Sequence, residues 1–297
     1  TCTNLRKIGN TTEFFNFSKV VDANHFFAFT TNLEGEHFPK TLEFPICTDV
    51  NSMFEQSGII DLFPTASFCK AATNMSNFFS TCRTIKRVGT IETPNVTTFN
   101  GAFGNANSLQ ELGFTSYGSV TTGGSTIFQS PRLKNPPHFN YTSLTNFNNT
   151  FKTSNIINDY QTPVSVSMHS GTSARELFNS ADQIKSIYIT GSASVTDWYR
   201  AFRTTTNLTK LEIYGINSSA TFTQAFDNAD GLQELKAPGI AQNIDLSDSH
   251  GLTAESINAI FSDLATVSGK TINVSNTVGA STCDTSIATS KGWTVTT

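Results

Sequence analysis

The chain has 297 residues, of which 37% are hydrophobic and only 14% are charged, whereas an average globular protein carries roughly 25% charged residues. Ser and Thr take the place of the missing charge and together make up about a quarter of the chain. The formal net charge of −4 provides no basic excess to neutralise phosphates, which argues against a nucleic-acid partner. Phe alone occurs 25 times, and so many large apolar side chains require a folded core rather than a disordered chain.

Membrane and targeting signals are absent from the sequence. No apolar run approaches the roughly 18 residues that a membrane-spanning helix needs. The first seven residues, Thr-Cys-Thr-Asn-Leu-Arg-Lys, lack the continuous apolar core of a secretion signal. We therefore expect a soluble, folded chain.

An internal repeat predicts the architecture. The segments 98–112 and 221–235 agree at most positions, and both place a small residue three positions after an aromatic residue and aliphatic residues six and nine positions after it. We call the aromatic residue of this frame the anchor. Anchors recur about every 24 to 28 residues, a period typical of solenoid proteins. In chain order they are Phe54, Phe79, Phe103, Phe151, Phe178, Phe202 and Phe226.

The start of the chain fits the frame less completely. Phe27 with Leu33 is a weak match. Cys2, Leu5 and Ile8 fall on the last three positions of the frame, whose anchor would precede residue 1. We therefore expect the chain to start inside a repeat, with either further residues before it or another element capping this end.

Each unit is predicted to contain one short helix and one short strand. An apolar residue stands four positions before the anchor, as in Trp198 and Phe202, and this separation places both residues on one face of a helix of two or three turns. An alternating run follows, for example Ile187-Tyr188-Ile189, which is typical of a strand with one buried face. Such units predict a right-handed α/β stack in which each coil covers its neighbour.

One unit in the middle of the chain is irregular. The frame fits poorly over residues 115–140, and Gly123-Gly124 stands where the first helix residue is expected. We predict a loop-bearing or degraded coil there. The residues that the frame would assign to it are Ile127, Ser130, Leu133 and Pro136.

The end of the chain departs from the frame. Residues 252–261 predict a longer amphipathic helix with Thr253 as its N-cap, followed by strands over 271–274 and 292–295. A terminal coil must hide its last apolar edge, which an atypical unit achieves. We therefore predict a solenoid over residues 1–250 and a C-terminal capping unit over 251–297.

One family pattern accounts for these units. The segment 74–88 reads Asn-Met-Ser-Asn-Phe-Phe-Ser-Thr-Cys-Arg-Thr-Ile-Lys-Arg-Val. It resembles the leucine-rich repeats of BspA-type bacterial surface proteins, N-M-x-x-M-F-x-x-C-x-x-L-x-x-L, with Phe78 where the second Met is common. Residues 287–295 are similar to endings found in such proteins from bacteria and their phages.

The resemblance covers most of the chain and implies a leucine-rich-repeat solenoid. Members of that family tend to be adhesins, surface lipoproteins, or phage tail and virion proteins. The chain departs from the pattern in its preference for Phe and in the residues at the cysteine position, which include Ser57, Ala106 and Ala181. The binding partner does not carry over, because the family keeps its framework and varies its surface.

The five cysteines do not have metal-ligand spacing, because none of them forms a C-x-x-C pair. We predict free, buried thiols that act as small apolar residues. One bridge, for example between Cys69 and Cys82, is the alternative.

The search for catalytic, cofactor and metal residues predicts none. His25 and His37 flank residues 32–36, where a metal site is imaginable, but neither has the spacing of a known ligand set. Asp245, Asp248 and His250 precede the cap helix, and we favour turn and capping chemistry over calcium binding there. We predict that the protein is not an enzyme. Two carboxylates within about 10 Å across a groove would revive an enzyme that hydrolyses sugars.

Two classes of function remain. The leading hypothesis is a non-enzymatic binding protein displayed outside a cell or on a virion, an adhesin of the phage tail-fibre or related virion type, with a bacterial cell-surface adhesin as a lesser alternative. Its hydroxyl and amide side chains would bind a host-surface glycan or protein. The competitor is an architectural virion or filament subunit that binds copies of itself. Both imply a larger assembly and an extracellular, cell-surface or virion location.

Overall fold

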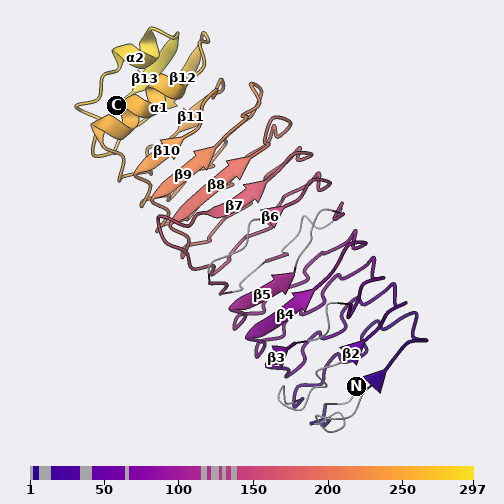
Figure 1. Ribbon diagram of the computed structural model, residues 1–297. Helices are drawn as coiled ribbons and strands as arrows, with labels where there is room; N and C mark the ends of the chain where they lie inside the picture. Colours follow the sequence, from indigo (N-terminus) through magenta and orange to yellow (C-terminus); the bar gives the residue numbers. More distant parts are fainter. Residues whose placement is uncertain are drawn as a thin grey trace. The chain divides into compact units, whose positions relative to one another are not determined.

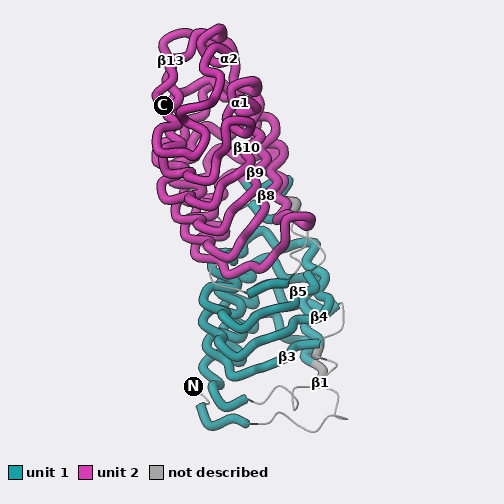
Figure 2. Tube along the Cα trace, turned by 90° about the vertical axis from the view of Figure 1, so that its left-hand side faces the viewer, with its two compact units in different colours: residues 1–134, 140–144 teal, residues 135–139, 145–297 magenta. Residues whose placement is uncertain are grey.

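A computed structural model describes residues 3–6, 15–33, 42–63, 67–114, 119–121, 127–128, 132–134 and 139–297. The chain divides into two compact units, shown in separate colours in Figure 2. Unit 1 comprises residues 1–134 and 140–144, and unit 2 comprises 135–139 and 145–297. Each unit is a parallel β-solenoid, and the described residues make about nine coils in all. Cys2, Ile8, Gly123, Gly124, Ser130 and Pro136 lie outside the described residues.

Short parallel strands form a ladder along each unit (Figure 1). In unit 1, β1 (Phe15–Asn16) and β2 (Leu42–Glu43) form a two-stranded sheet. A three-stranded sheet follows, made of β3 (Asp61–Leu62), β4 (Arg87–Ile91) and β5 (Glu111–Phe114). A five-stranded sheet has the order β10-β9-β8-β7-β6, with bounds Glu234–Lys236, Lys210–Ile213, Ser186–Thr190, Val164–Ser167 and Phe139–Asn140. The last sheet has the order β11-β12-β13, with bounds Ile244–Asp245, Lys270–Asn273 and Trp293–Thr296.

Nested β-turns, and not a helix, occupy the segment around each anchor. In the coil of Phe178, the amides of Leu177, Asn179 and Ala181 each donate to the carbonyl three residues back, at 3.3, 3.2 and 3.0 Å. The amides between them point out of the coil, and those of Glu176 and Phe178 donate to carbonyls of the next coil at 2.8 and 2.7 Å. In an α-helix, consecutive amides bond to carbonyls four residues back, whereas these bonds span three residues and involve every second amide. The prediction of one short helix in each unit is therefore wrong for the described coils.

This alternation of inward-bonded and outward-pointing amides requires left-handed backbone, with positive φ, on both sides of the anchor. Where the structure describes them, the residues two before and two after an anchor have positive φ, for example Glu176 (53°) and Ser180 (60°), or Arg200 (54°) and Thr204 (59°). Left-handed backbone costs a residue with a Cβ about 1 kcal/mol or more. The same residues donate to the next coil, as Ser180 does to Arg203 at 2.8 Å. The hydrogen bond between coils thus offsets the local strain.

The anchors form a column of stacked, buried rings in each unit. In unit 1 the ring centroids of Phe27, Phe54, Phe79, Phe103 and Phe128 follow one another at 5.4, 5.4, 6.0 and 5.4 Å. In unit 2 those of Phe151, Phe178, Phe202 and Phe226 are 4.9, 6.2 and 5.6 Å apart. Phe27 therefore belongs to the column. In the irregular coil the anchor is Phe128, one residue later than the frame places it.

Two coils are shorter by one residue after the anchor. The frame assigns Ile60 and Ile157 to the core, but these side chains are exposed, and Ile59 and Ile156 are buried instead. The reason is a serine at the small position. Ser57 and Ser154 accept the amide two residues on through their hydroxyl oxygens, both at 3.3 Å, which closes a tighter turn. Coils with Ala or Thr there form a longer turn, as in Leu208 to Thr205 at 3.0 Å.

The cysteines in the described residues are free thiols, and Cys47, Cys69 and Cys82 are buried. Cys82 occupies the small position of its coil and donates to the carbonyl of Ser57 at 3.0 Å. Burial raises the pKa of this thiol to about 12. These thiols therefore act as core residues, with no bridge between Cys69 and Cys82.

The C-terminal cap replaces a strand by a helix. Helix α1 (Ala254–Asp263) packs beside β10, where the amide of Gly239 donates to the carbonyl of Asp263 at 2.9 Å. The hydroxyl oxygen of Thr253 accepts the amide of Ser256 at 3.3 Å and so caps the helix. A second helix, α2 (Ser286–Thr289), packs against α1 and β13. Helix α1 thereby covers the edge that β10 would otherwise expose.

Among the residues that the structure describes, no helix is long and apolar enough to cross a bilayer.

We predict that Thr204→Gly raises the stability of unit 2 by about 1 kcal/mol, because glycine relieves the positive φ of a β-branched residue. The hydrogen bond from residue 204 to Asp227 (2.8 Å) is made by the backbone and is retained. The measurement is the midpoint of thermal unfolding. Thr206→Gly, at a position without positive φ, is the matched control and should lower the midpoint. Equal destabilisation by both substitutions would contradict the role of the left-handed backbone.

Candidate functional site

The histidines that the sequence singled out do not form a ligand set. The imidazole of His25 lies 3.5 Å from the carboxylate of Glu55 and stacks on Phe29, and that of His250 lies 2.9 Å from Asp230. His37 lies outside the described residues. Within those residues, no three His, Cys, Asp or Glu side chains converge as a metal site would require.

The aspartates before the cap helix form turns. The carboxylate of Asp245 accepts the amide and the hydroxyl of Ser247 at 2.9 and 2.7 Å. Asp248 accepts the amide of Asn228 at 3.1 Å. Burial and the nearby carboxylates of Asp248 and Asp245 raise the pKa of Asp227, opposed by Arg203. These contacts are the turn and capping chemistry that the sequence favours.

The outer face of β8, β9 and β10 presents charged and aromatic side chains in two columns. Parallel register places Ser186, Lys210 and Glu234 side by side, and in the same way Tyr188, Glu212 and Lys236. The residues between them, Ile187, Leu211 and Leu235, are buried. Strand alternation therefore turns these polar side chains outward, and strand pairing spaces the members of each column about 4.8 Å apart.

A groove crosses these columns. Its larger part is a hollow of about 560 Å³. Its smaller part, about 230 Å³, includes Tyr160, Pro163 and Tyr188. Both parts share Lys210 and Glu212, so they are neighbours. We call the two together the tyrosine groove. The side chains of its larger part used below are Lys210, Glu212, Glu234, Lys236, Glu255, Ala259 and Asp263.

Lys210 is the centre of an ionic network in the groove. Its ammonium nitrogen lies 2.9 Å from Glu212 and 3.5 Å from Glu234. It also lies 5.3 Å from the centroid of the Tyr160 ring. The Tyr160 hydroxyl in turn donates to Glu234, three coils along the chain. Tyr160 therefore lies across the sheet and connects the two parts of the groove.

Helix α1 forms the wall of the larger hollow. Glu255, Ala259 and Asp263 are four residues apart and line the hollow from one face of this helix. Neither Glu255 nor Asp263 has a side-chain hydrogen bond or ion pair within the described residues. The groove thus combines a paired network on the sheet with unpaired carboxylates on the helix.

The carboxylates of Glu212 and Glu234 lie close enough together for a sugar-hydrolysing pair, but Glu212 lacks the raised pKa of an acid catalyst. Glu212 and Glu234 contact the same ammonium group. Burial opposes ionisation of Glu212, but hydrogen bonds from Lys210 and from the Tyr214 hydroxyl (3.1 Å) outweigh it and lower its pKa. A general acid for sugar hydrolysis needs a raised pKa. The lowered pKa of Glu212 instead favours its ionised form.

A second hollow, of about 580 Å³, lies over the sheet of β11, β12 and β13. Hydroxyl and amide side chains dominate its lining, and Asp245 is its only carboxylate. The polar residues are Thr221, Thr223, Gln224, Gln242, Asn243, Thr271, Asn273 and Thr296. It offers neutral hydrogen-bonding groups without an aromatic ring at its surface, because Phe222 is buried.

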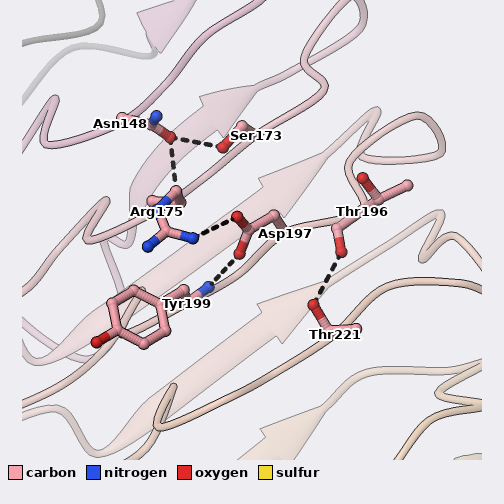
Figure 3. Close-up of polar contacts among 7 residues, drawn as sticks. All are labelled: Asn148, Ser173, Arg175, Thr196, Asp197, Tyr199 and Thr221. Carbon is pink, nitrogen blue, oxygen red and sulfur yellow. Dashed lines mark hydrogen bonds and ion pairs between the residues drawn. The ribbon is translucent and has the colours of Figure 1, made fainter.

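A ladder of polar contacts follows the turns of unit 2 (Figure 3). Asn148 accepts the Ser173 hydroxyl at 2.7 Å and the Arg175 amide at 2.9 Å. Arg175 donates to Asp197 at 2.8 Å, and Asp197 accepts the Tyr199 amide at 2.9 Å. These bonds connect consecutive coils and close the first turn of each segment. The ladder is structural, because its polar groups are used within the protein.

Sequence analysis missed the tyrosine groove. It assigned Tyr160 to the repeat frame as a core residue, whereas its side chain is exposed on the groove. The alternation of Lys210, Glu212, Glu234 and Lys236 was the available signal, because these residues face outward from two consecutive predicted strands. The anchors, in contrast, lie in the interior and take no part in the groove.

Comparison with known proteins gives no relative: no protein-family model, curated protein or solved structure matches the chain.

We predict that Glu212→Gln lowers the thermal midpoint at neutral pH and that this difference disappears on acidification. The folded protein lowers the pKa of Glu212, so its ionic contacts stabilise the fold above the pKa of the unfolded chain. This contribution is present above the ordinary glutamate pKa of about 4.3 and is lost as pH falls below it through the lowered folded pKa. Glu255→Gln removes a carboxylate without a partner and should follow the wild-type profile. A Glu212→Gln defect that stays constant down to pH 3 would contradict the ionic network.

Proposed function

We propose that the protein is a non-enzymatic binding protein displayed on a cell surface or virion, of the adhesin type found among the BspA-like repeat proteins that it resembles. Its ligand-binding surface is the tyrosine groove of unit 2. The partner is a host-surface glycan or protein, bound through hydroxyl, carboxylate and aromatic groups.

The observation that supports this proposal is the fixed geometry of the groove. Its floor is made of β8, β9 and the end strand β10, beside which α1 packs. Its outward side chains are held by one another, as Tyr160 is by Glu234 and Lys236 by the Tyr214 ring at 5.8 Å. A preformed groove loses little conformational entropy when a ligand binds. Tyrosine contributes a rigid, amphipathic contact surface with few rotatable bonds.

The Tyr188 side chain is the test position in the groove. Its ring is half-buried, packs on Tyr214 with a centroid distance of 5.6 Å, and lines the smaller hollow. Tyr199 is a matched control in the same unit, because its half-buried ring lies at the turns between Arg175 and Arg200, 4.3 and 4.7 Å from their guanidinium carbons.

We predict saturable binding of the purified wild-type protein to at least one member of a glycan array or of a panel of candidate host cells. Tyr188→Ala should weaken this binding about tenfold or more, since a buried contact aromatic is typical of binding hot spots. Tyr199→Ala should leave it unchanged. Saturable binding nowhere, together with self-association of the wild type in light scattering, would contradict the proposal in favour of an architectural subunit.

A further inference from the structure

The charge of the tyrosine groove selects among ligands. Its larger hollow contains two lysines and four carboxylates. Lys210 is neutralised by Glu212 and Glu234, and Lys236 lies over the face of Tyr214. Glu255 and Asp263 therefore remain as an unbalanced negative charge on the wall. Lys236 keeps its charge, but the four carboxylates exceed the two lysines by two charges, so the hollow as a whole repels an acidic ligand.

The two unpaired carboxylates have a defined separation. Glu255 and Asp263 are eight residues apart on α1, which corresponds to about 12 Å along the helix. Ala259 lies between them and leaves the wall open at its middle. A ligand with positive groups at two points along its length would pair with both carboxylates at once.

The floor of the groove favours sugar rings over a peptide. β8 and β9 are paired on both sides, and β10 is paired with β9 and covered by α1. The edges of β8 and β9 are paired and that of β10 is covered by α1, so an extended peptide cannot add to this sheet here as a further strand. Tyr188 instead offers the half-buried face of a ring, on which the apolar C–H face of a pyranose can pack. Its hydroxyl has no partner within the described residues and can bond a sugar hydroxyl.

The size of the groove requires more than one sugar. Tyr188 lies on β8 and Lys236 on β10, two strand separations away, which is about 10 Å. The carboxylates of α1 lie beyond β10. A ligand that contacts both Tyr188 and the helix must therefore be an oligomer that crosses the strands.

We propose that the tyrosine groove binds an oligosaccharide of amino sugars with free, protonated amines. One ring packs on Tyr188, and the amines of other rings pair with Glu255 and Asp263. This inference rests on the proposed binding function and names its ligand class.

The experiment measures the affinity of the full chain for three oligosaccharides of equal length by isothermal titration calorimetry: a deacetylated glucosamine oligomer, its N-acetylated form, and a glucuronate-containing oligomer. We expect the amine form to bind best, the acetylated form more weakly, and the acidic form not at all. Salt should weaken the amine form selectively, because screening affects only the charged contacts.

Variants test the preference for amino sugars separately from the binding function. The double variant Glu255→Gln, Asp263→Asn should weaken the amine form by roughly three- to tenfold and leave the acetylated form unchanged. Tyr188→Ala should weaken both forms. Asp182→Asn, which changes a carboxylate of unit 2 outside the groove, is the control and should alter neither.

Four outcomes would overturn the inference. Equal affinity for the amine and acetylated forms, or an amine preference that survives in the double variant, would refute the role of α1. Binding of the acidic oligomer that Tyr188→Ala abolishes would refute the ligand class while the binding function stands. Saturable binding of none of the three, with binding elsewhere on the glycan array, would refute this class alone.

Discussion

The hydrogen bonds between successive nested turns are the interaction on which the rest of the structure depends. The segment around Phe178, for example, closes three turns on itself and directs the alternate amides of Glu176, Phe178 and Ser180 at the next coil. The left-handed residues that make this possible are unfavourable alone. They persist because the next coil accepts their amides and because the anchor rings stack beneath them. A coil is therefore stable only with its neighbour in place.

This constraint also determines where a binding site can form. Coils that repeat the same turns must repeat the same strand register, so side chains on the outer face stand in columns, as Tyr188, Glu212 and Lys236 do. Columns alone give a flat surface. The groove arises where the repeat ends, because α1 replaces a strand beside β10 and forms a wall. Helix α1 therefore both caps the repeat and forms the wall of the proposed binding groove.

The repeat, the anchors and the cap could be predicted from the sequence, but the conformation of each coil could not. Aromatic residues four apart, such as Trp198 and Phe202, are expected on one helix face, yet nested turns bring their rings to a centroid distance of 6.0 Å as well. Better signals were Asn and Gly at the left-handed positions, including Asn77, Gly101 and Asn105, because both tolerate positive φ. The groove escaped prediction for another reason. Its residues come from β8, β9, β10, α1 and the segment of Tyr160 before β7, and only the tertiary structure brings them together.

Hydrogen exchange resolved by residue in a Phe202→Ala variant tests the central claim most directly. The amides of Glu176, Phe178 and Ser180 donate to carbonyls of residues 199, 201 and 203. If coils depend on their neighbours, loosening the coil of residue 202 must deprive these three amides of protection, although their own sequence is unchanged. The account predicts that they exchange as fast as the amides of the altered coil. Full wild-type protection at these three positions, beside a rapidly exchanging altered coil, would contradict it.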